Sequence, residues 1–380
     1  MKIDLKNPAH IKLLLLSKGV NFKDSDLLGV GSKYSENRYY YNISNEVSQF
    51  KNQLPSEILL PKHIESSMYF NPDSELRLKT NGNKIGLFRK NDFLCRIYFN
   101  PRPNFFDKKI NNDLVCKQVV SMYGRHILAL FSNAYCFYFM DGNQCKFCSL
   151  QPSRQSIGKQ NINLITPEIA KKAVKIALKN DGKRIKYIMY TCGTNRNEEK
   201  SYMEQSQIIK AVRAIYNTKG AHHLTIMPTV NDKLLVNIKK AGLDSIAFDI
   251  EVFDESLFQQ YCPGKQKYFG RDNFLLSFKI ARSIFGHNNV KAGFVGGLEP
   301  LDSMKEGMEF FGSQGVSIAV NVFHPDVNTE FSNKPRPEVE YLLKMAKMQS
   351  EIYIKYKLKS VFPVGGRRSS LDTEIYRNFF

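Results

Sequence analysis

From residue 126 to residue 322, short apolar runs alternate with longer segments in which apolar residues recur at helical spacing. A short apolar run bounded by turn residues is typical of a buried strand, and the longer periodic segments are typical of amphipathic helices. The predicted strands cover 126–132, 185–190, 224–227, 245–250, 290–294 and 316–322. The predicted helices between them cover 167–180, 203–216, 232–240, 272–285 and 303–312.

Strands that alternate with helices form a parallel sheet, because a parallel neighbour needs a crossover connection. Crossovers of one hand wind such a sheet into a full or partial barrel. We therefore predict an α/β fold in which residues 116–325 form a partial (β/α)6 TIM-like barrel. Functional groups in such barrels lie at the C-terminal ends of the strands and on the loops that follow them.

Two further regions flank the predicted barrel. Residues 1–115 are predicted to form an N-terminal α+β extension, and residues 326–380 a C-terminal helix with a basic tail. Helical spacing predicts helices over 9–18, 44–54 and 337–357. Alternating runs between 67 and 102, separated by polar turns, indicate hairpins. The segment 363–370, which contains Arg367 and Arg368, is expected to be flexible.

Three cysteines, Cys136, Cys145 and Cys148, lie on the loop that follows the first predicted barrel strand. An iron–sulfur cube held by three thiolates keeps one iron open for a substrate or cofactor. A zinc site with a distant fourth ligand is the competing interpretation. The candidates for that ligand are His126, His222, His223 and His324. Buried thiols without a metal are the third interpretation.

Composition narrows these interpretations only in part. The 380 residues include 55 lysines and arginines against 36 acidic residues, which gives a net charge of +19. Such a charge is compatible with a nucleic-acid partner, but lysines lie on most predicted helices, and a biased genome would give the same balance. Seven cysteines, an odd number, do not suggest a disulfide framework. No apolar run is long enough for a membrane helix and the start lacks an apolar signal segment, so we expect a cytoplasmic protein.

Small and acidic residues follow later strands of the predicted barrel. Cys192, Gly193 and Thr194 form a turn after the second strand, and Asp249 and Glu251 share one face at the end of the fourth. A glycine pair, Gly296 and Gly297, ends the fifth strand, and Arg271 opens the preceding helix. Taken singly, each feature is more often structural than functional. Their succession at the strand ends of one barrel favours a cofactor site.

With these residues the chain resembles the radical S-adenosylmethionine (radical SAM) superfamily, and within it the biotin-synthase-like branch. The resemblance covers about residues 120–325. Its motifs are the three-cysteine loop and the segments 241–251, 261–265, 268–271 and 293–299. The spacing departs from the usual pattern, because eight residues rather than three separate Cys136 from Cys145. Cys145 and Cys148 keep the usual spacing, and the aromatic Phe147 stands between them.

The resemblance implies that Cys136, Cys145 and Cys148 bind a 4Fe–4S cluster whose open iron takes the amino and carboxylate groups of S-adenosylmethionine. It implies that a reduced cluster cleaves S-adenosylmethionine to methionine and a 5′-deoxyadenosyl radical, which takes a hydrogen atom from a substrate. An external one-electron donor, such as flavodoxin or ferredoxin, would supply the electron. The implied contacts of S-adenosylmethionine are Cys192, Gly193, Thr194, Asp249, Glu251, Arg271, Gly296 and Gly297.

Three functions remain open from the sequence. The leading hypothesis is a radical enzyme acting on a small molecule, with Tyr190, His222, His324 and Asp326 as candidate substrate contacts. The second is a radical enzyme that modifies RNA or a peptide, favoured by the net charge and by Arg367 and Arg368. The third is a zinc-binding protein without catalysis. For Cys192 and Cys262, a buried, inert thiol is favoured over a redox or cluster-linked thiol, and both interpretations stay open.

Overall fold

The computed structural model describes residues 3–27, 55, 57–81, 84–133, 135–151 and 165–380. The helix predicted over 44–54 lies outside these residues. A seven-stranded sheet with the order β12-β11-β10-β9-β8-β7-β6 forms the centre of the fold. Its strands are β6 (Val120–Tyr123), β7 (Ile127–Asn133), β8 (Tyr187–Cys192), β9 (His222–Thr225), β10 (Ser245–Glu251), β11 (Val290–Gly296) and β12 (Ser317–Val322). The strands from β7 to β12 pair in parallel, which confirms the six predicted barrel strands.

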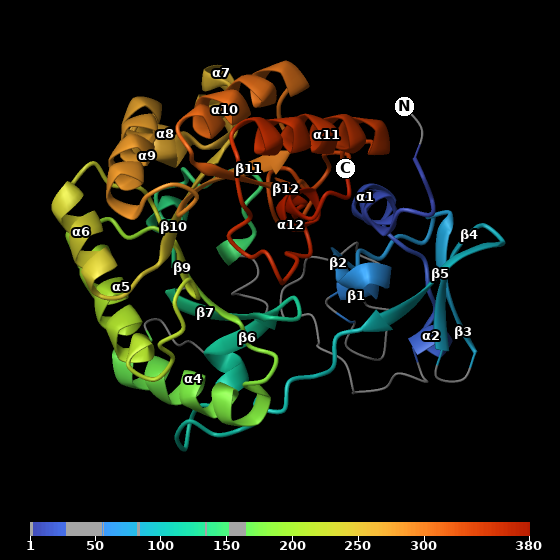
Figure 1. The fold of residues 1–380 in the computed structure, drawn as a ribbon, viewed down its shortest axis with the longest axis horizontal. Helices are drawn as coiled ribbons and strands as arrows, with labels where there is room; N and C mark the ends of the chain where they lie inside the picture. The colour runs from blue at the N-terminus through green and yellow to red at the C-terminus, as the bar shows by residue number, and fades with distance from the viewer. Residues whose placement is uncertain (1–2, 28–54, 56, 82–83, 134, 152–164) are drawn as a thin grey trace.

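The sheet curls into a half-barrel, and an arc of helices covers its outer face (Figure 1). This confirms the predicted mixed α/β fold with a partial TIM-like barrel. The helices are α4 (Pro167–Asp181), α5 (Glu198–Arg213), α6 (Asp232–Lys240), α7 (Glu255–Tyr261), α8 (Pro263–Tyr268), α9 (Arg271–Phe285), α10 (Leu301–Ser313) and α11 (Val339–Lys355). Side-chain caps explain several starts, since Thr166 accepts from Ile169 and Asn197 from Lys200. The edge strand β6 is antiparallel to β7 and was not predicted.

The N-terminal region forms a second, smaller sheet with the order β2-β1-β5-β4-β3. Its strands are β1 (Glu57–Leu60), β2 (Ile64–Ser67), β3 (Leu76–Asn81), β4 (Lys84–Arg89) and β5 (Asp92–Phe99). The last three confirm the hairpins predicted between residues 67 and 102. Helix α1 (Pro8–Lys18) confirms the first predicted helix and packs with this sheet in a separate apolar core. A short helix α2 (Asp24–Leu27) follows it.

The C-terminal segment returns to the barrel instead of forming a flexible tail. Ser370 pairs with Asn321 of β12, and the N–H of Val322 donates to the Ser369 carbonyl at 2.8 Å. Arg367 and Arg368 are buried, with 7% and 8% of their surface exposed. The expectation of a flexible basic tail was therefore wrong, because backbone pairing and long-range contacts fix this segment. Helix α12 (Asp372–Tyr376) follows it, close to α1 (Figure 1).

The boundaries predicted at residues 115 and 325 stay predictions. Within the described residues, no helix combines the length and the apolar character that crossing a bilayer would require.

Candidate active site

The three cysteines lie on the loop that leaves β7, at the C-terminal edge of the parallel sheet. Cys136 directly precedes a short 3-10 turn over Phe137–Phe139. Its thiol receives hydrogen bonds from Thr194 and from the backbone at Tyr138, while burial raises its pKa. The N–H of Phe137 donates to the Thr194 carbonyl at 2.9 Å. Thr194, directly after β8 and Gly193, thus fixes the start of the cysteine loop to the end of that strand.

Gly193 is glycine because two backbone segments meet there. A Cβ at this position would lie 2.0 Å from the Tyr135 carbonyl oxygen and 3.0 Å from the Cys136 nitrogen. Its N–H donates to the Asn133 carbonyl at 2.8 Å. The turn that we predicted to contact S-adenosylmethionine therefore contacts the cysteine loop in this structure. The adjoining Cys192 thiol is half-buried, and burial raises its pKa to about 12.

Cys145 and Cys148 lie farther along the same loop, within electrostatic reach of each other and of Cys136. The Cys148 N–H donates to the Cys145 carbonyl at 2.9 Å, a tight turn between the two thiols. Burial raises the pKa of Cys148, whereas a hydrogen bond from Cys262 lowers the pKa of Cys145. A fourth thiol, the fully buried Cys262, therefore borders the three predicted ligands.

A buried ion pair borders the same thiols. Lys265 Nζ lies 2.6 Å from Glu251 Oε1 and 2.5 Å from the Asp249 carbonyl oxygen. Burial alone would lower the pKa of Lys265, but Glu251 and the thiols of Cys145 and Cys262 raise it well above its usual value. Burial raises the pKa of Glu251 to about 7 although Lys265 opposes this. The positive charge of Lys265 would offset part of the negative charge of bound thiolates.

A bulge at the end of β10 separates the two acids that we predicted to share a face. The register with β11 shifts between Asp249 and Glu251. Glu251 has a φ of 73°, a left-handed conformation that is uncommon outside glycine. The Asp249 side chain lines a cavity inside the barrel, whereas Glu251 pairs with Lys265. The simple alternation expected of a strand was therefore wrong at this position.

The donor set fits a cluster held by three thiolates. All three thiols come from one loop and interact electrostatically, and Cys145 lies near the Lys265 ammonium. Within the parts of the chain that the structure describes, no three His, Cys, Asp or Glu side chains meet around a point that one metal ion could occupy. A cluster does not require that arrangement, because each thiolate binds a different iron.

The remaining predicted contacts of S-adenosylmethionine have protein partners in the structure. Arg271 donates from Nε and Nη2 to the Phe253 carbonyl at 3.1 and 2.8 Å, and its guanidinium lies 4.7 Å from the Phe253 ring centre. A Cβ on Gly296 would lie 2.8 Å from Met345 Sδ, and one on Gly297 would lie 2.1 Å from Pro337 Cγ. The two glycines therefore allow close packing of the C-terminal region.

The candidate substrate contacts divide into two pairs. Tyr190 and His222 are fully buried, and Tyr190 Oη lies 2.8 Å from His222 Nδ1. Neither residue lines the cavity inside the barrel, so their prediction as substrate contacts finds no support there. His324 does line this cavity, and its Nδ1 lies 2.7 Å from Asp326 Oδ1. Asp326 also accepts from Ser149, the residue after Cys148, which connects the cysteine loop to the cavity.

None of the four candidate histidine ligands is directed at the cysteines. His126 Nδ1 lies 2.7 Å from the Arg184 carbonyl oxygen, and His223 Nδ1 lies 2.8 Å from Ser245 Oγ. His222 and His324 have the partners given above. The zinc hypothesis thus gains no fourth ligand from these histidines.

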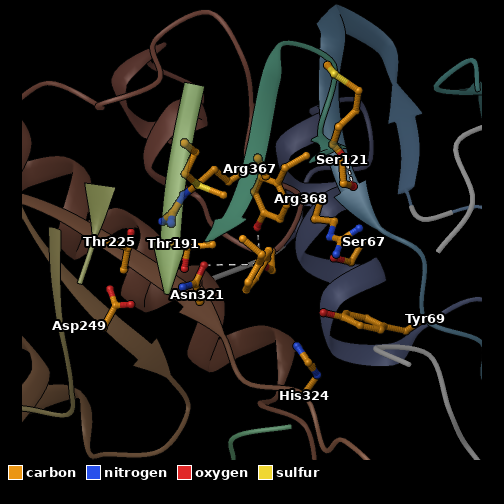
Figure 2. Close-up of a pocket in the computed structure, with 16 residues that line it drawn as sticks. Ser67, Tyr69, Ser121, Thr191, Thr225, Asp249, Asn321, His324, Arg367 and Arg368 are labelled. Carbon is orange, nitrogen blue, oxygen red and sulfur yellow. Dashed lines mark hydrogen bonds between the residues drawn. The ribbon is translucent and has the colours of Figure 1, made fainter. Parts of the chain in front are cut away.

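The cavity inside the half-barrel has a volume of about 290 Å³ (Figure 2). Strands β6 to β10 and β12 contribute to its wall, and so do the N-terminal region and the segment 367–369. Figure 2 shows Asp249 and Thr225 on one side, Arg367 and Arg368 from the C-terminal segment, and Tyr69 beside His324. A second cavity, of about 260 Å³, lies beside the cysteine loop and is lined in part by Phe137, Tyr138 and Thr194.

Three of the site's residues were not assigned to this site from the sequence. Lys265 and Ser149 are ordinary residues in loop or short-helix contexts, and Arg367 was assigned to a flexible tail. Their contacts join segments that are far apart in the chain: Lys265 reaches Glu251, and Ser149 reaches Asp326. Such pairings leave no periodic signal. The only sequence cue was the position of Lys265 within the motif 261–265.

The chain has distant similarity to known proteins. No protein-family model matches the chain. The chain is 23% identical over 306 residues to the bacteriochlorophyllide c C-7(1)-hydroxylase of Chlorobaculum limnaeum, covering 77% of this chain and 76% of the hydroxylase.

Two solved structures have partial similarity to the chain. HydG, a maturase of the FeFe-hydrogenase, is 17% identical with a TM-score of 0.48, covering 63% of this chain and 54% of that one. A radical SAM methyltransferase from Sphaerobacter thermophilus is 11% identical with a TM-score of 0.45, covering 79% of this chain and 82% of that one. The chain thus spans little more than half the length of HydG.

The three-cysteine loop at the end of the first parallel strand of a half-barrel is the arrangement that the resemblance to the radical SAM enzymes predicts. S-adenosylmethionine, the iron–sulfur cluster and the electron donor stay predictions of that resemblance. The biotin-synthase-like branch stays a prediction.

Proposed function

We propose that Cys136, Cys145 and Cys148 hold a 4Fe–4S cluster and that the enzyme acts on a small molecule. When bound, the cluster and S-adenosylmethionine would supply a 5′-deoxyadenosyl radical that takes a hydrogen atom from an unactivated carbon of the substrate. The observation that carries the proposal is the position of the three thiols on one loop at the C-terminal edge of the sheet, beside Lys265.

The residues around the thiols have identifiable tasks in this proposal. Thr194 orients the Cys136 sulfur through its hydrogen bonds, and Lys265 lies beside Cys145, where its charge favours the thiolate. Phe147, partly buried in the core, lies next to Cys148 and limits access of water to the site. Ser149 and Asp326 connect the loop to His324 in the cavity, where the substrate would bind.

The predicted contacts of S-adenosylmethionine belong to this proposal with two refinements. Arg271 already donates two N–H groups to the Phe253 carbonyl, so a carboxylate would have to use another edge of the guanidinium. Glu251 is paired with Lys265, so Asp249, which lines the cavity, is the better-placed acid for a hydroxyl group.

Similarity to a hydroxylase is compatible with this reaction class. A hydroxylase replaces the hydrogen of a C–H bond with a hydroxyl group. Removal of hydrogen from carbon is the step that we propose here. The RNA or peptide alternative keeps only the net charge of +19 in its favour, since Arg367 and Arg368, which also supported it, are buried.

The test is to purify the protein without oxygen, reduce it with dithionite and measure 5′-deoxyadenosine by mass spectrometry. We expect a brown protein with iron and sulfide that forms 5′-deoxyadenosine from S-adenosylmethionine. Cys145→Ala should lose the product. Cys95→Ala, a buried thiol of the N-terminal core, is the matched control and should keep it. A colourless, zinc-loaded wild-type protein would contradict the proposal.

A further inference from the structure

We propose that the substrate in the half-barrel cavity carries an anionic group, a carboxylate or a phosphate, that is bound by the guanidinium groups of Arg367 and Arg368. The inference rests on the proposed function, because it takes the cavity to be the place where the substrate binds. It adds the chemical class of the substrate and gives the C-terminal segment a role.

The first support is the position of the two arginines. Both side chains line the cavity, together with Asp249, Thr191 and Asn321 from the ends of barrel strands (Figure 2). The strand ends are where barrel enzymes bind their substrates. A ligand in this cavity would therefore contact the arginines and the strand ends together.

The second support is the way in which the arginines are held. Lys12 Nζ donates to the Arg367 carbonyl at 3.0 Å and to the Ser370 carbonyl at 2.6 Å. The N–H of Ser67 donates to the Arg368 carbonyl at 3.0 Å. Helix α1 and strand β2 therefore fix the backbone of this segment. A fixed backbone reduces the entropy that a charged side chain loses when it binds a ligand.

The third support is the hydrogen bonding of Arg367. Its Nη2 lies 2.9 Å from Ser370 Oγ and 3.5 Å from Asp372 Oδ1, so one edge of the guanidinium has protein partners. Its Nε is buried and has no hydrogen-bond partner. A buried donor without an acceptor is costly, and turning this donor towards an oxyanion in the cavity would remove that cost.

Charge favours an anion over a cation. In the wall of the half-barrel cavity, Arg367 and Arg368 are positive and Asp249 is negative. His324, also in the wall, is paired with Asp326. Hydroxyl and amide groups from Ser67, Ser121 and Asn321 surround these charges. At about 290 Å³ the cavity is near the lower limit of small-molecule sites, which favours a metabolite-sized ligand.

The competing interpretation is that the arginines only hold the C-terminal segment in place. The Arg367–Asp372 contact supports that reading for Arg367. The two interpretations differ in what an arginine variant does to the binding of small molecules, so the test measures binding directly.

The experiment uses a small-molecule extract, below about 1 kDa, of the organism that encodes the chain. Wild-type protein, Arg368→Gln and Arg377→Gln are incubated with the extract and washed by ultrafiltration, and retained compounds are identified by mass spectrometry. Arg377 is the matched control, because it lies on the same C-terminal segment and donates to the Lys62 carbonyl outside the cavity. Melting temperatures establish that each variant is folded.

We expect wild-type protein and Arg377→Gln to retain anionic compounds and Arg368→Gln to retain at least about tenfold less, as the loss of a charge-assisted hydrogen bond implies. Retention that is equal in all three proteins, or limited to neutral or cationic compounds, would overturn the inference. If Arg368→Gln does not fold, Arg368→Lys replaces it, with reduced retention expected because an ammonium cannot bind a carboxylate or phosphate in the bidentate way that a guanidinium can.

The same compounds then test the two proposals separately. Added to the dithionite-reduced enzyme, the retained anions should increase formation of 5′-deoxyadenosine. If the enzyme retains anions but never forms 5′-deoxyadenosine, the proposed function fails and the anion site stands. If the enzyme forms 5′-deoxyadenosine and neutral compounds alone stimulate it, the anion site fails and the proposed function stands.

Discussion

Two buried lysine–glutamate pairs in this molecule differ in how completely their charges are matched. Lys12 Nζ has three acceptors: Glu374 Oε2 at 2.9 Å and two backbone carbonyls of the C-terminal segment. Lys265 Nζ has two oxygen acceptors, and it also lies beside the thiols of Cys145 and Cys262. All three N–H groups of the Lys12 ammonium donate hydrogen bonds to protein oxygens. The charge of Lys265, in contrast, also acts on the neighbouring thiols.

This difference indicates different roles. The Lys12 pair is completely inaccessible, 0% exposed on both sides, and it joins the first helix to the last. The Lys265 pair is 9% and 15% exposed and lies where the proposed cluster would bind. A buried ion pair whose hydrogen bonds are all satisfied stabilises the arrangement of the chain. A buried ion pair whose charge also acts on reactive groups is typical of a functional site.

The largest effect is expected for Lys12→Met. Removing the lysine leaves Glu374 buried without its cation and two backbone carbonyls without their hydrogen-bond donor. The free energy of unfolding, measured in urea, should therefore fall by about 3–5 kcal/mol. Lys18→Met is the matched control, because its partner Glu338 is 72% exposed, and a loss below about 1 kcal/mol is expected. Equal stabilities of Lys12→Met and wild-type protein would remove the distinction between the two pairs.

For Lys265→Met we expect a smaller fall in the free energy of unfolding in urea, of about 1–3 kcal/mol. Glu251, with a pKa already raised to about 7, takes up a proton more readily than an ordinary carboxyl group and so avoids a buried charge. Iron content after reconstitution should fall in parallel. Lys267→Met, whose pair with Asp141 is exposed, should keep both stability and iron. A variant at Lys265 that loads iron normally would show that this pair is only structural.

Lys291 gives a third case, a buried lysine for which no carboxylate lies at ion-pair distance among the described residues. Burial lowers its pKa to about 7. Because the unfolded lysine keeps its proton up to higher pH, this group makes stability rise between about pH 7 and pH 10, by at most about 1.4 kcal/mol per pH unit. Lys291→Met should be more stable than wild-type protein at pH 7, and the difference should shrink towards pH 9. A constant difference in urea unfolding across that range would contradict a neutral Lys291.

The barrel could be predicted because its signals are local. Apolar runs and capped helices identify β7 to β12, and α6 has the predicted bounds of residues 232–240. The position of the cysteine loop follows from the same pattern. Helix α5 starts five residues before the predicted 203, at Glu198, because Asn197 caps it within a polar stretch that carries no apolar period.

The rest of the site depends on contacts that no local pattern carries. Arg367 and Arg368 are basic residues after glycines, which is the composition of a flexible tail. They are buried because Lys12, more than 350 positions away, donates to the Arg367 carbonyl. At the bulge, Glu251 likewise pairs with Lys265 of another element. Gly193 and Gly297 suggested ligand contacts, yet each is explained by a close approach of other protein atoms.

The central claim is that three thiolates hold a cluster with an open iron that takes S-adenosylmethionine. The most direct measurement is the electron paramagnetic resonance spectrum of the dithionite-reduced protein, recorded with and without S-adenosylmethionine. We expect a cluster signal that changes when S-adenosylmethionine is added and that is absent from Cys145→Ala. A signal that S-adenosylmethionine leaves unchanged, or a reduced protein without any cluster signal, would contradict the account.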